Sequence, residues 1–511
     1  MKAIRFLLAL FPALLVPLVA EDRKPNIIVI MADDLGFGDL SCYGATTYET
    51  PHIDALAREG MQFMSGYCTA STCTPTRFSL LTGTYAFRVK GTGIAPPSAP
   101  AVIAGGTPTI ASMLKSAGYR TAVVGKWHLG LGGPDGPDWN GELKPGPLEI
   151  GFDYSFLLPT TNDRVPQVYV ENHRVLNLDP ADPLRVGNKK PDEDHPTGIS
   201  HRDTLKMDWT HGHNNTIHNG ISRIGFYTGG ETARFRDEDL ADKWVEKSVA
   251  WIEKNKETPF FLFFASHDNH VPRIPHERFQ GVTPHGFRSD SVVQLDWCVG
   301  ELTKTVERLG LSQNTLFVFC SDNGPVMDDG YADDALEKLG EHRAAGPFRG
   351  GKYSVYEGGT RTPFLTRWKG TITPGLSDEV VSTMDLYASL ASLTGAELPK
   401  DAALDTTDVL GALLGEKNAK GRSELVQQDN GSGGTFGFRS GNWKLLRHDS
   451  KKARNVVVEK KLENVDVPQF QLYDLSVDPS ESEDLFATQP EVASRLQARL
   501  DEIIESGRTR P

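Results

Sequence analysis

Three short runs of almost continuous apolar residues mark the chain, at residues 26–32, 259–265 and 315–320. Runs of this length without polar alternation predict strands that are buried on both faces, as in a parallel sheet. A further strand is predicted at residues 119–124, which are rich in β-branched side chains. The chain is therefore expected to contain a central sheet whose strands lie inside the protein.

Segments with apolar residues three and four positions apart lie between these strands at residues 240–252 and 290–309, and after the last of them at residues 384–395. This spacing predicts amphipathic helices with one buried face. Two more helices are predicted to begin at Thr50-Pro51 and Thr107-Pro108, because threonine caps a helix and proline suits its first position. Strands that alternate with helices predict an α/β fold.

Two regions depart from this regular pattern. Residues 131–235 are rich in Gly, Pro, Asn, Asp and His and have little periodicity, which is typical of functional loops. Short strands near residues 443–447 and 471–474 and a helix from Glu491 predict a small α+β subdomain. We therefore expect a large domain at residues 21–400 and a C-terminal subdomain at residues 401–511, with a small antiparallel sheet and a helix.

Carboxylate-bearing pairs follow two of the predicted strands. Asp33-Asp34 follows residues 26–32, and Asp322-Asn323 follows residues 315–320 after one serine. Adjacent carboxylates repel one another, and a cation relieves that repulsion; hard oxygen ligands favour Ca²⁺ or Mg²⁺ over Zn²⁺. A solvated turn is the ordinary interpretation of one such pair. Its recurrence at the carboxyl end of a second strand, where α/β sheets bind ligands, favours a metal site.

The N-terminus predicts export. Lys2 and Arg5 precede the apolar run 6–19, and Ala20 stands before Glu21, as in a secretory signal peptide at residues 1–20. A single membrane anchor is the alternative, but the run is short for a span, and no other segment approaches one. We expect a periplasmic or extracellular protein without a stable membrane span.

Charge and cysteine content narrow the choice of function. The formal net charge of −13 makes nucleic-acid binding a poor candidate, and an anionic substrate would need a local basic pocket. Five cysteines among 511 residues do not predict a disulfide framework. The sequence leaves open whether Cys42, Cys68, Cys298 and Cys320 form any pair.

Cys73 begins the segment CTPTRFSLLTG, which resembles the sulfatase signature C-x-P-x-R followed by L-x-T-G. In that family the cysteine is oxidised to formylglycine, whose hydrated aldehyde is the nucleophile. The resemblance implies that Cys73 is modified by a formylglycine-generating enzyme and that Arg77 holds the hydrate in place.

Further segments match the same family. GKWHLG at residues 125–130 carries Lys126 and His128, and GKYSVYEGGTR at residues 351–361 carries Lys352. The resemblance implies that the two lysines bind sulfate and that His128 is the base that expels it. An ordinary surface lysine is the alternative in each segment, but matches over so many positions disfavour it.

Two further segments resemble family stretches that contact the substrate. The segment SHDNHVP contains two histidines; the resemblance favours His270 as the group that protonates the leaving alcohol, together with Lys352, and places His267 behind it. Thr161 lies in a stretch that resembles the one bringing a hydroxyl to the sulfate pocket. His211, His213 and His218 lack a nearby cysteine or paired carboxylate, so we interpret them as solvated or sugar-contacting residues rather than a metal site.

The resemblance covers residues 24–395 and implies an alkaline-phosphatase-like α/β fold, in which helices cover both faces of a mixed sheet. It also implies a catalytic sulfatase domain and a smaller C-terminal subdomain. It implies one Ca²⁺ ion. The implied ligands are Asp33, Asp34, Asp322, Asn323 and an oxygen of modified Cys73.

The expected activity is hydrolysis of sulfate esters, on a sulfated polysaccharide or oligosaccharide. A phosphodiesterase or phosphonate monoester hydrolase of the same superfamily is one alternative, although Lys126, His128 and Lys352 fit a one-metal sulfate site better than a two-metal site. A non-catalytic glycan-binding protein is the other alternative. That interpretation requires a changed nucleophile or ligand, and none of the motif positions is changed. The sequence identifies neither the sugar nor the sulfate position, nor whether the enzyme acts at chain ends, nor the oligomeric state.

Overall fold

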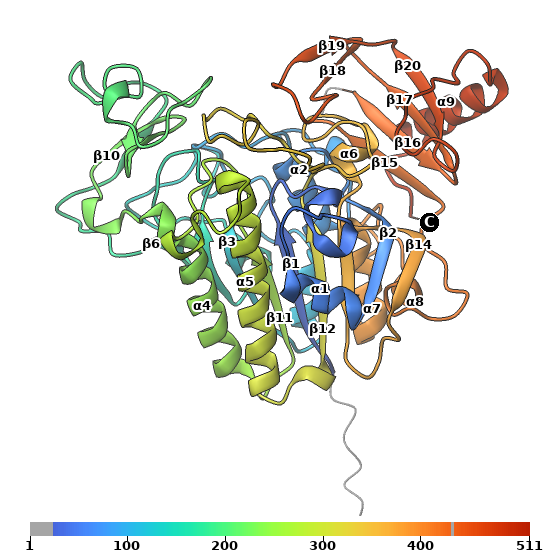
Figure 1. The fold of residues 1–511 in the computed structure, drawn as a ribbon. Coiled ribbons are helices and arrows are strands. Elements are labelled where there is room, and N and C mark those ends of the chain that lie inside the picture. Colours follow the sequence, from blue (N-terminus) through green and yellow to red (C-terminus); the bar gives the residue numbers. More distant parts are fainter. Residues whose placement is uncertain (1–23, 431–433, 511) are drawn as a thin grey trace, which may run out of the picture.

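The central sheet carries its strands in the order β14-β2-β13-β12-β1-β11-β3-β4-β5-β6 (Figure 1). The computed structural model describes residues 24–430 and 434–510, so the predicted signal peptide, residues 1–20, lies outside the described residues. Neighbours from β12 through β4 run parallel, whereas β13 pairs antiparallel with β12 and β2. The strands are β1 (Asn26–Ala32), β2 (Met61–Tyr67), β3 (Arg120–Lys126), β4 (Tyr154–Leu158), β5 (Val170–Glu171), β6 (Arg174–Val175), β11 (Phe260–Ala265), β12 (Thr315–Ser321), β13 (Phe364–Arg367) and β14 (Gly375–Ser382).

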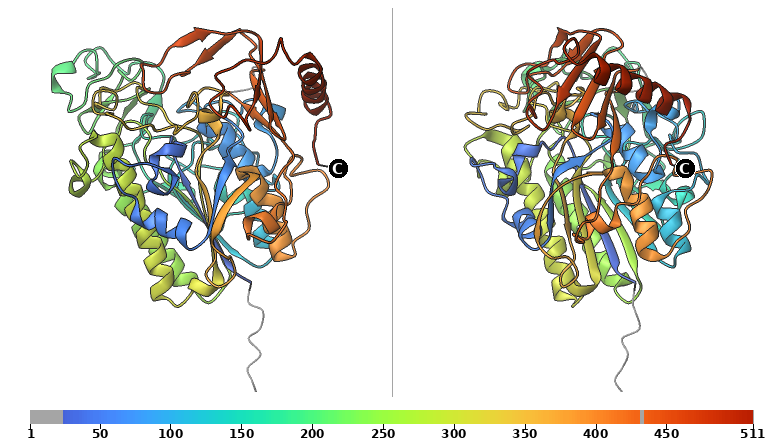
Figure 2. Two further views of the ribbon diagram at one scale, coloured as in Figure 1. Left: turned by 45° about the vertical axis from the view of Figure 1, so that its right-hand side comes forward. Right: turned by 90° about the vertical axis from the view of Figure 1, so that its right-hand side faces the viewer.

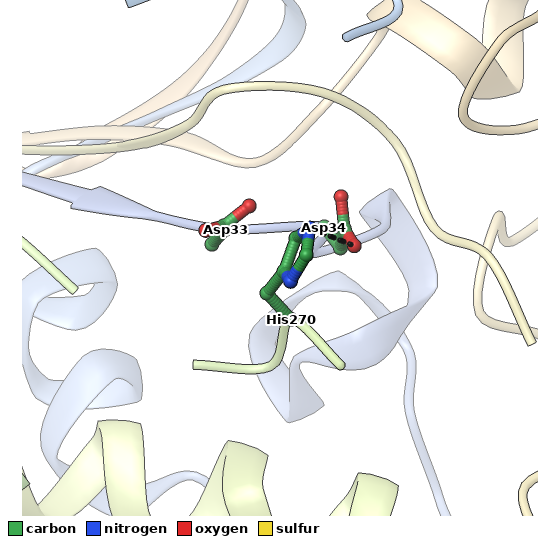
Figure 3. Close-up of side chains that lie close together, drawn as sticks. All are labelled: Asp33, Asp34 and His270. Atoms are coloured by element: carbon green, nitrogen blue, oxygen red, sulfur yellow. Dashed lines mark ion pairs between the residues drawn. The ribbon is translucent and has the colours of Figure 1, made fainter. Parts of the chain in front are cut away.

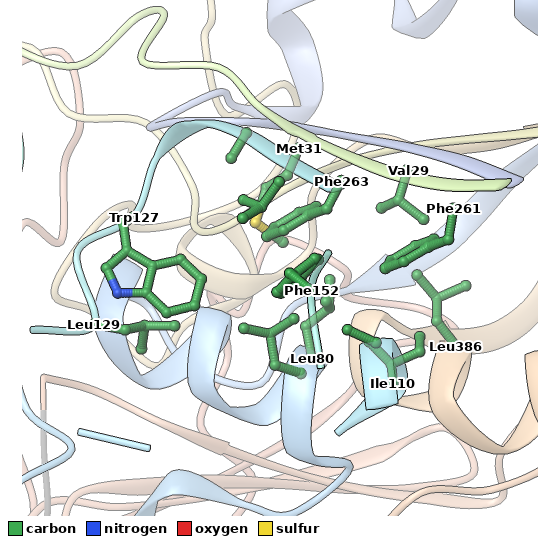
Figure 4. Packing of buried hydrophobic residues seen from close by; sticks show 14 of the residues in the cluster. Val29, Met31, Leu80, Ile110, Trp127, Leu129, Phe152, Phe261, Phe263 and Leu386 are labelled. Carbon is green, nitrogen blue, oxygen red and sulfur yellow. The ribbon is translucent and has the colours of Figure 1, made fainter. Parts of the chain in front are cut away.

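Helices cover both faces of this sheet. From Ile27 to Ala32, β1 carries apolar side chains on both of its faces, and each face needs a covering layer. Alternate residues of β1 face opposite sides: Val29 packs in one hydrophobic cluster and Ile30 in the other. The first cluster includes α2 (Cys73–Thr82), α3 (Ile110–Ser116), α7 (Leu386–Thr394) and α8 (Leu410–Leu413), and the second α1 (Pro51–Arg58), α4 (Leu240–Asn255) and α5 (Gly286–Arg308). Figure 4 shows the first, with Val29 and Phe261 of the sheet beside helix residues such as Leu386. The predicted mixed α/β sandwich is confirmed.

Strand register brings the polar strand ends together. Ala32 of β1 lies opposite Ser321 of β12, while Met31 pairs with Ala265 of β11 and Ala265 with Gly125 of β3. The residues that follow these positions are therefore level at one edge of the sheet, as expected for parallel neighbours.

Several local predictions need correction. The helix predicted from Thr107-Pro108 begins at Ile110, because Thr109 accepts a hydrogen bond from Ser112 N and caps the helix there. Strands β2 and β4 belong to the central sheet. Neither was predicted from the sequence, and β4 lies inside the region that was expected to be irregular. Within residues 131–235, the remaining strands are short ones such as β7 (Arg185–Gly187), β8 (Ile217–His218), β9 (Ile221–Ser222) and β10 (Phe226–Thr228).

A second, antiparallel sheet forms the C-terminal lobe, with the order β15-β16-β17-β20. It packs beside the strand end of the large sheet that carries α2 and α6 (Glu357–Thr360), seen at the top of Figure 1 and from two further sides in Figure 2. Its elements are β15 (Glu424–Gln428), β16 (Phe436–Ser440), β17 (Trp443–Arg447), β20 (Phe470–Asp474), α9 (Pro490–Glu505) and the separate pair β18 (Lys452–Arg454) and β19 (Asn464–Asp466). The domain boundary predicted near residue 400 stays a prediction. Helix α8 lies beyond that residue in the sequence but packs in the core of the large domain.

A buried ion-pair cluster joins the two lobes. The Lys444 Nζ of β17 lies 2.8 Å from the Glu357 carboxylate and 3.0 Å from Glu481, and all three side chains are fully buried. Glu357 begins α6 (Glu357–Thr360), in the segment that carries Lys352. Burial opposes ionisation of Glu357, but Lys444 and then Arg361 lower its pKa to about 2. The cluster therefore fixes the C-terminal lobe against a segment of the predicted site.

Replacement of Lys444 by methionine is expected to destabilise the protein by about 3–5 kcal/mol, because two buried carboxylates lose their shared cation. Denaturant unfolding should show an earlier transition. Lys420→Met is the matched control, since Lys420 pairs with Glu379 at an exposed position and exposed pairs contribute little. A Lys444→Met variant that unfolds at the wild-type denaturant concentration would contradict this account.

No helix in the described part of the chain is long and apolar enough to cross a membrane.

Candidate active site

Cys73 is the first residue of α2, and Thr72 is the N-cap. The cysteine is buried, and its Sγ lies 3.2 Å from His128 Nδ1. The start of a helix favours negative charge, because backbone N–H groups there lack helical partners. Burial raises the pKa of the Cys73 thiol, against the pull of Lys126. An unmodified thiol at this position is therefore a poor nucleophile, since the thiolate is the reactive form.

Arg77 lies one helical turn after Cys73 and is tied to the sheet. Its Nε and one terminal nitrogen donate to Asp322 Oδ2 at 2.9 and 2.7 Å, and the other donates to the Lys126 carbonyl at 3.0 Å. All of these groups are buried. A fork of charge-assisted hydrogen bonds fixes an arginine more firmly than one contact does. Arg77 thus sets the position of α2 relative to the ends of β3 and β12.

The segment after β3 delivers Lys126 and His128 to the same side. Trp127 between them packs in the hydrophobic core. His128 lies beyond the end of β3 and has a φ of +52°, so the backbone is not extended there. Lys126 Nζ pairs with Asp33. His128 Nε2 contacts the Ala95 carbonyl at 3.0 Å, so that nitrogen carries the proton and Nδ1 is left as the acceptor facing Cys73.

Burial and nearby positive charge keep the His128 ring neutral. Burial, followed by Lys126 and Arg164, lowers the pKa of His128 well below its ordinary value. A neutral imidazole with its unprotonated nitrogen toward Cys73 is suited to take a proton from a group at that position.

The carboxylates after β1 and β12 meet as the sequence predicts. Asp34 Oδ1 accepts from Asn323 Nδ2 at 2.7 Å, and Asp322 Oδ1 accepts from the Asp34 backbone N–H at 3.3 Å. Lys352 Nζ lies 2.8 Å from Asp34 Oδ2. Within the described residues, the group of possible metal ligands comprises Asp33, Asp34 and His270, whose ligand atoms lie within 4.8 Å of one another (Figure 3).

The residues predicted as metal ligands fit a divalent cation. Asp33 Oδ1 and Asn323 Oδ1 are buried and have no hydrogen-bond partner, and such atoms are costly unless a ligand satisfies them. Burial and then Asp322 raise the pKa of Asp33 well above its ordinary value, and burial raises the pKa of Asp34. A bound cation would offset both effects, because its charge favours the ionised carboxylates.

His270 and Thr161 lie beside this group. The His270 Nε2 is 3.9 Å from Asp34 Oδ2, and Nδ1 contacts the Val271 carbonyl at 2.7 Å. Thr161 Oγ1 lies 3.5 Å from His270 Nδ1 and donates to Asp163. Burial and then Lys126 lower the pKa of His270 well below its ordinary value.

His267 faces a different part of the molecule. Its Nδ1 accepts a hydrogen bond from Trp244 Nε1 of α4 at 3.1 Å, and its Nε2 lies 3.6 Å from Asp268. These contacts place it behind the strand end, and its predicted role in substrate binding stays a prediction. Of the loop histidines, His213 is buried against Asp163 at 3.0 Å, His218 is buried, and His211 is exposed.

A group of charged residues that the sequence did not predict lines the same site. Arg164 donates to both oxygens of Asp163 at 2.9 Å; burial opposes its charge, but Asp163 and then Cys73 raise its pKa. Asp329 lies 2.9 Å from Lys352 Nζ and accepts from the Tyr353 hydroxyl at 3.0 Å. These residues come from loops without periodicity, and the one available signal was the density of charged residues beside Thr161.

Comparisons with known proteins agree with this geometry. A model of the sulfatase family matches residues 25–396. The chain belongs to the sulfatase family. It is a sulfuric ester hydrolase, so the non-catalytic alternative is set aside.

Two curated sulfatases match over most of this sulfatase's length. N-acetylgalactosamine-6-O-sulfatase of Bacteroides thetaiotaomicron is 48% identical over 490 residues, covering 96% of this chain and 94% of that protein. Human arylsulfatase A is 31% identical over 512 residues, covering 96% of this chain and 90% of that protein.

A solved structure described under the metabolism of multiple glycosaminoglycans by Bacteroides thetaiotaomicron has a TM-score of 0.90 and 48% identity, covering 94% of this chain and 100% of that one. The alkaline-phosphatase-like fold expected from the resemblance is therefore confirmed.

The five cysteines, all in the described residues, are free.

Proposed function

We propose that this sulfatase removes 6-O-sulfate from N-acetylgalactosamine units of a sulfated glycan, with Cys73 converted to formylglycine. The observation that carries the reaction is the position of Cys73 at the start of α2, facing the unprotonated nitrogen of His128. Arg77, Lys126 and Lys352 are close enough for their charges to interact with a charge on Cys73. Support for the sugar is the 48% identity to a sulfatase named for that substrate.

Buried cations would hold the sulfate group. Lys126 and Lys352 are buried beside Asp33 and Asp34, and in this dry environment their charge acts more strongly on a sulfuryl group than it would in water. One Ca²⁺ held by Asp33, Asp34, Asp322, Asn323 and an oxygen at Cys73 would supply further positive charge at the sulfuryl oxygens.

Proton transfer is divided between two sides of the site. His128 is neutral and its Nδ1 faces residue 73, which suits it to act as base for the hydroxyl there. On the other side, Asp329 and Asp34 raise the pKa of Lys352 well above its ordinary value despite burial, so this lysine carries a proton. The sulfate charge would raise the pKa of His270 on binding, since a nearby anion favours the charged ring. His270 with Lys352 is then the acid for the leaving alcohol.

Maturation and export complete the proposal. The predicted signal peptide would direct the chain to the periplasm or the cell exterior, and a formylglycine-generating enzyme would act on Cys73. That step must precede folding or accompany it, because Cys73 is only 2% exposed in the folded chain.

A panel of sulfated sugars tests the proposed substrate. We expect kcat/KM for 6-O-sulfated N-acetylgalactosamine to exceed that for the 4-O-sulfated isomer and the 6-O-sulfated glucosamine counterpart by about a hundredfold or more, because a site that binds specific hydroxyls rejects isomers strongly. A phosphonate monoester included in the panel should be the poorer substrate. Equal rates on all members would contradict the assigned sugar while leaving the sulfatase activity in place.

A further inference from the structure

A second cavity adjoins the Cys73 site on the side of the C-terminal lobe. Its volume is about 260 Å³. Described residues from the large domain and from the C-terminal lobe line it, among them Tyr353, Ser354, Asp429, Thr435, Lys452 and Arg454. None of these residues belongs to the predicted catalytic or metal-binding set, so the cavity is a separate feature of the molecule.

Tyr353 forms the wall between this cavity and the catalytic residues. Its hydroxyl donates to Asp329 at 3.0 Å, and Asp329 lies 2.9 Å from the Nζ of Lys352. Its backbone N–H donates to the Ser71 carbonyl at 2.8 Å. The cavity therefore begins within one side chain of the sulfate-binding lysine.

The other rim of the cavity touches the residue that caps the catalytic helix. Thr72 donates through its hydroxyl to the Asp429 carbonyl at 3.3 Å. Asp429 follows the end of β15, which is continuous with the sheet of the C-terminal lobe. A sugar chain with one unit in the Cys73 site would thus meet the C-terminal lobe at its next unit.

Basic side chains give this cavity its binding chemistry. The Arg454 guanidinium lies over the Tyr353 ring at 4.4 Å, and in the described chain it contacts no carboxylate. Lys452, two residues earlier on the same strand, is exposed. The Asp429 side chain contributes one negative charge to the lining of the cavity. Its backbone carbonyl accepts the hydrogen bond from Thr72. In a protein of net charge −13, two basic residues beside the catalytic pocket form a local site for an anion.

The remaining lining is suited to a sugar rather than to a bare ion. Ser354, Thr435 and Ser450 supply hydroxyl groups, and Asn430 and Asn464 supply amides. Groups of this kind exchange hydrogen bonds with sugar hydroxyls, whereas an arginine fork recognises a carboxylate or sulfate by paired hydrogen bonds. The cavity thus combines an anion-binding group with donors and acceptors for hydroxyls.

We infer that this cavity binds the acidic sugar joined to the sulfated unit, with Arg454 and Lys452 receiving its anionic group. The inference rests on the proposed sulfatase activity and extends it from a sulfated monosaccharide to the neighbouring residue of the glycan. The anion is the carboxylate of a hexuronate or a second sulfate ester; the two share the chemistry that Arg454 recognises, and the substrates below separate them.

The test compares kcat/KM for a sulfated monosaccharide and for disaccharides that contain it. The disaccharides carry, at the second sugar, a hexuronate, the same sugar with its carboxylate reduced to an alcohol, or the reduced sugar bearing one sulfate. We expect wild-type enzyme to prefer an anionic second sugar over the reduced one by about tenfold, the effect of one charge-assisted contact. Arg454→Ala should remove that preference, and Lys452→Ala should lower it.

Arg447→Ala is the matched control, because Arg447 lies on the neighbouring β17 and pairs with Asp501 away from the cavity. It should leave the preference at the wild-type value. A preference that survives in Arg454→Ala, or that falls equally in Arg447→Ala, would overturn the inference. So would an equal loss in Arg454→Ala on the monosaccharide and on every disaccharide, which would indicate that Arg454 acts through Tyr353 alone.

Calorimetric titration with an unsulfated hexuronate-containing disaccharide tests the cavity without catalysis. Wild-type protein should bind it, and Arg454→Ala should bind it about tenfold more weakly; equal binding by both proteins would overturn the inference. If wild-type enzyme fails to hydrolyse the sulfated monosaccharide yet shows this difference in binding, the proposed substrate is wrong and the cavity assignment stands.

Discussion

Replacement of Cys73 by serine is expected to reduce sulfate release by more than about 10⁴-fold, as loss of a nucleophile does in other hydrolases. A serine hydroxyl at the start of α2 has the position of the nucleophile but lacks the second hydroxyl through which sulfate is expelled. The Cys73→Ser variant can still release one equivalent of alcohol per active site, because the serine can accept the sulfate group once. It should not turn over further, because the sulfate cannot be expelled. The measurement is sulfate release from the sulfated monosaccharide, followed over many turnovers.

Cys68→Ser provides the matched control, since Cys68 is also buried and donates its thiol hydrogen to the Ala70 carbonyl at 3.1 Å. It should fold and retain activity, and both variants should melt close to the wild-type temperature. Full turnover by Cys73→Ser would show that the reaction does not require a nucleophile made from Cys73. An equal loss in Cys68→Ser would show that the effect arises from packing of buried sulfur.

Replacement of His128 by alanine is expected to slow steady sulfate release by about 10²–10⁴-fold, the usual contribution of a positioned general base. The leaving alcohol should still appear once per active site, because His128 faces residue 73 rather than His270 and Lys352 on the alcohol side. Rapid-mixing kinetics with a chromogenic sulfate ester would show a burst of alcohol followed by arrest.

His128→Asn is the better-folded companion variant, because asparagine tolerates the positive φ of +52° that His128 adopts. His201→Ala, at an exposed position, controls for the loss of a histidine elsewhere and should leave both phases unchanged. A burst that disappears together with turnover would contradict the role assigned to His128 and would place it in the first transfer.

Much of the fold was predictable because it depends on local patterns. The apolar runs of β1, β11 and β12 are buried on both faces, and their continuity is visible without any tertiary contact. β2 was missed because Gln62 and Ser65 interrupt its apolar pattern, although both are buried against the neighbouring strands of the sheet. β4 was missed because its short run stands inside a long irregular region.

Site residues were predictable where they follow strands or form a family motif. Asp33 and Asp322 meet because parallel strands share one carboxyl edge, a rule of topology rather than of distance along the chain. Arg164 and Asp329 lie several residues beyond the ends of β4 and β12, and in the sequence they resemble exposed loop residues. Their burial depends on how residues 131–235 and 325–350 fold over the sheet, which no short pattern encodes.

The role of Glu357 could not be predicted from the motif that contains it. Its segment matched the family motif, but the match suggested only that the residue belongs near the site. The structure places its carboxylate between Lys444 and Arg361, at 2.8 and 3.1 Å. A residue inside a catalytic motif therefore holds the C-terminal lobe, and with it the cavity beside Tyr353, against the catalytic segment.

Tandem mass spectrometry of the tryptic peptide 59–77 from active enzyme tests the central claim most directly. Cleavage after Arg58 and Arg77 releases Cys68 and Cys73 in one peptide, so Cys68 serves as the internal control for handling and oxidation. The account predicts an aldehyde at residue 73, which reacts with a hydrazide, and an alkylatable thiol at residue 68. A thiol at both positions in fully active enzyme would contradict it.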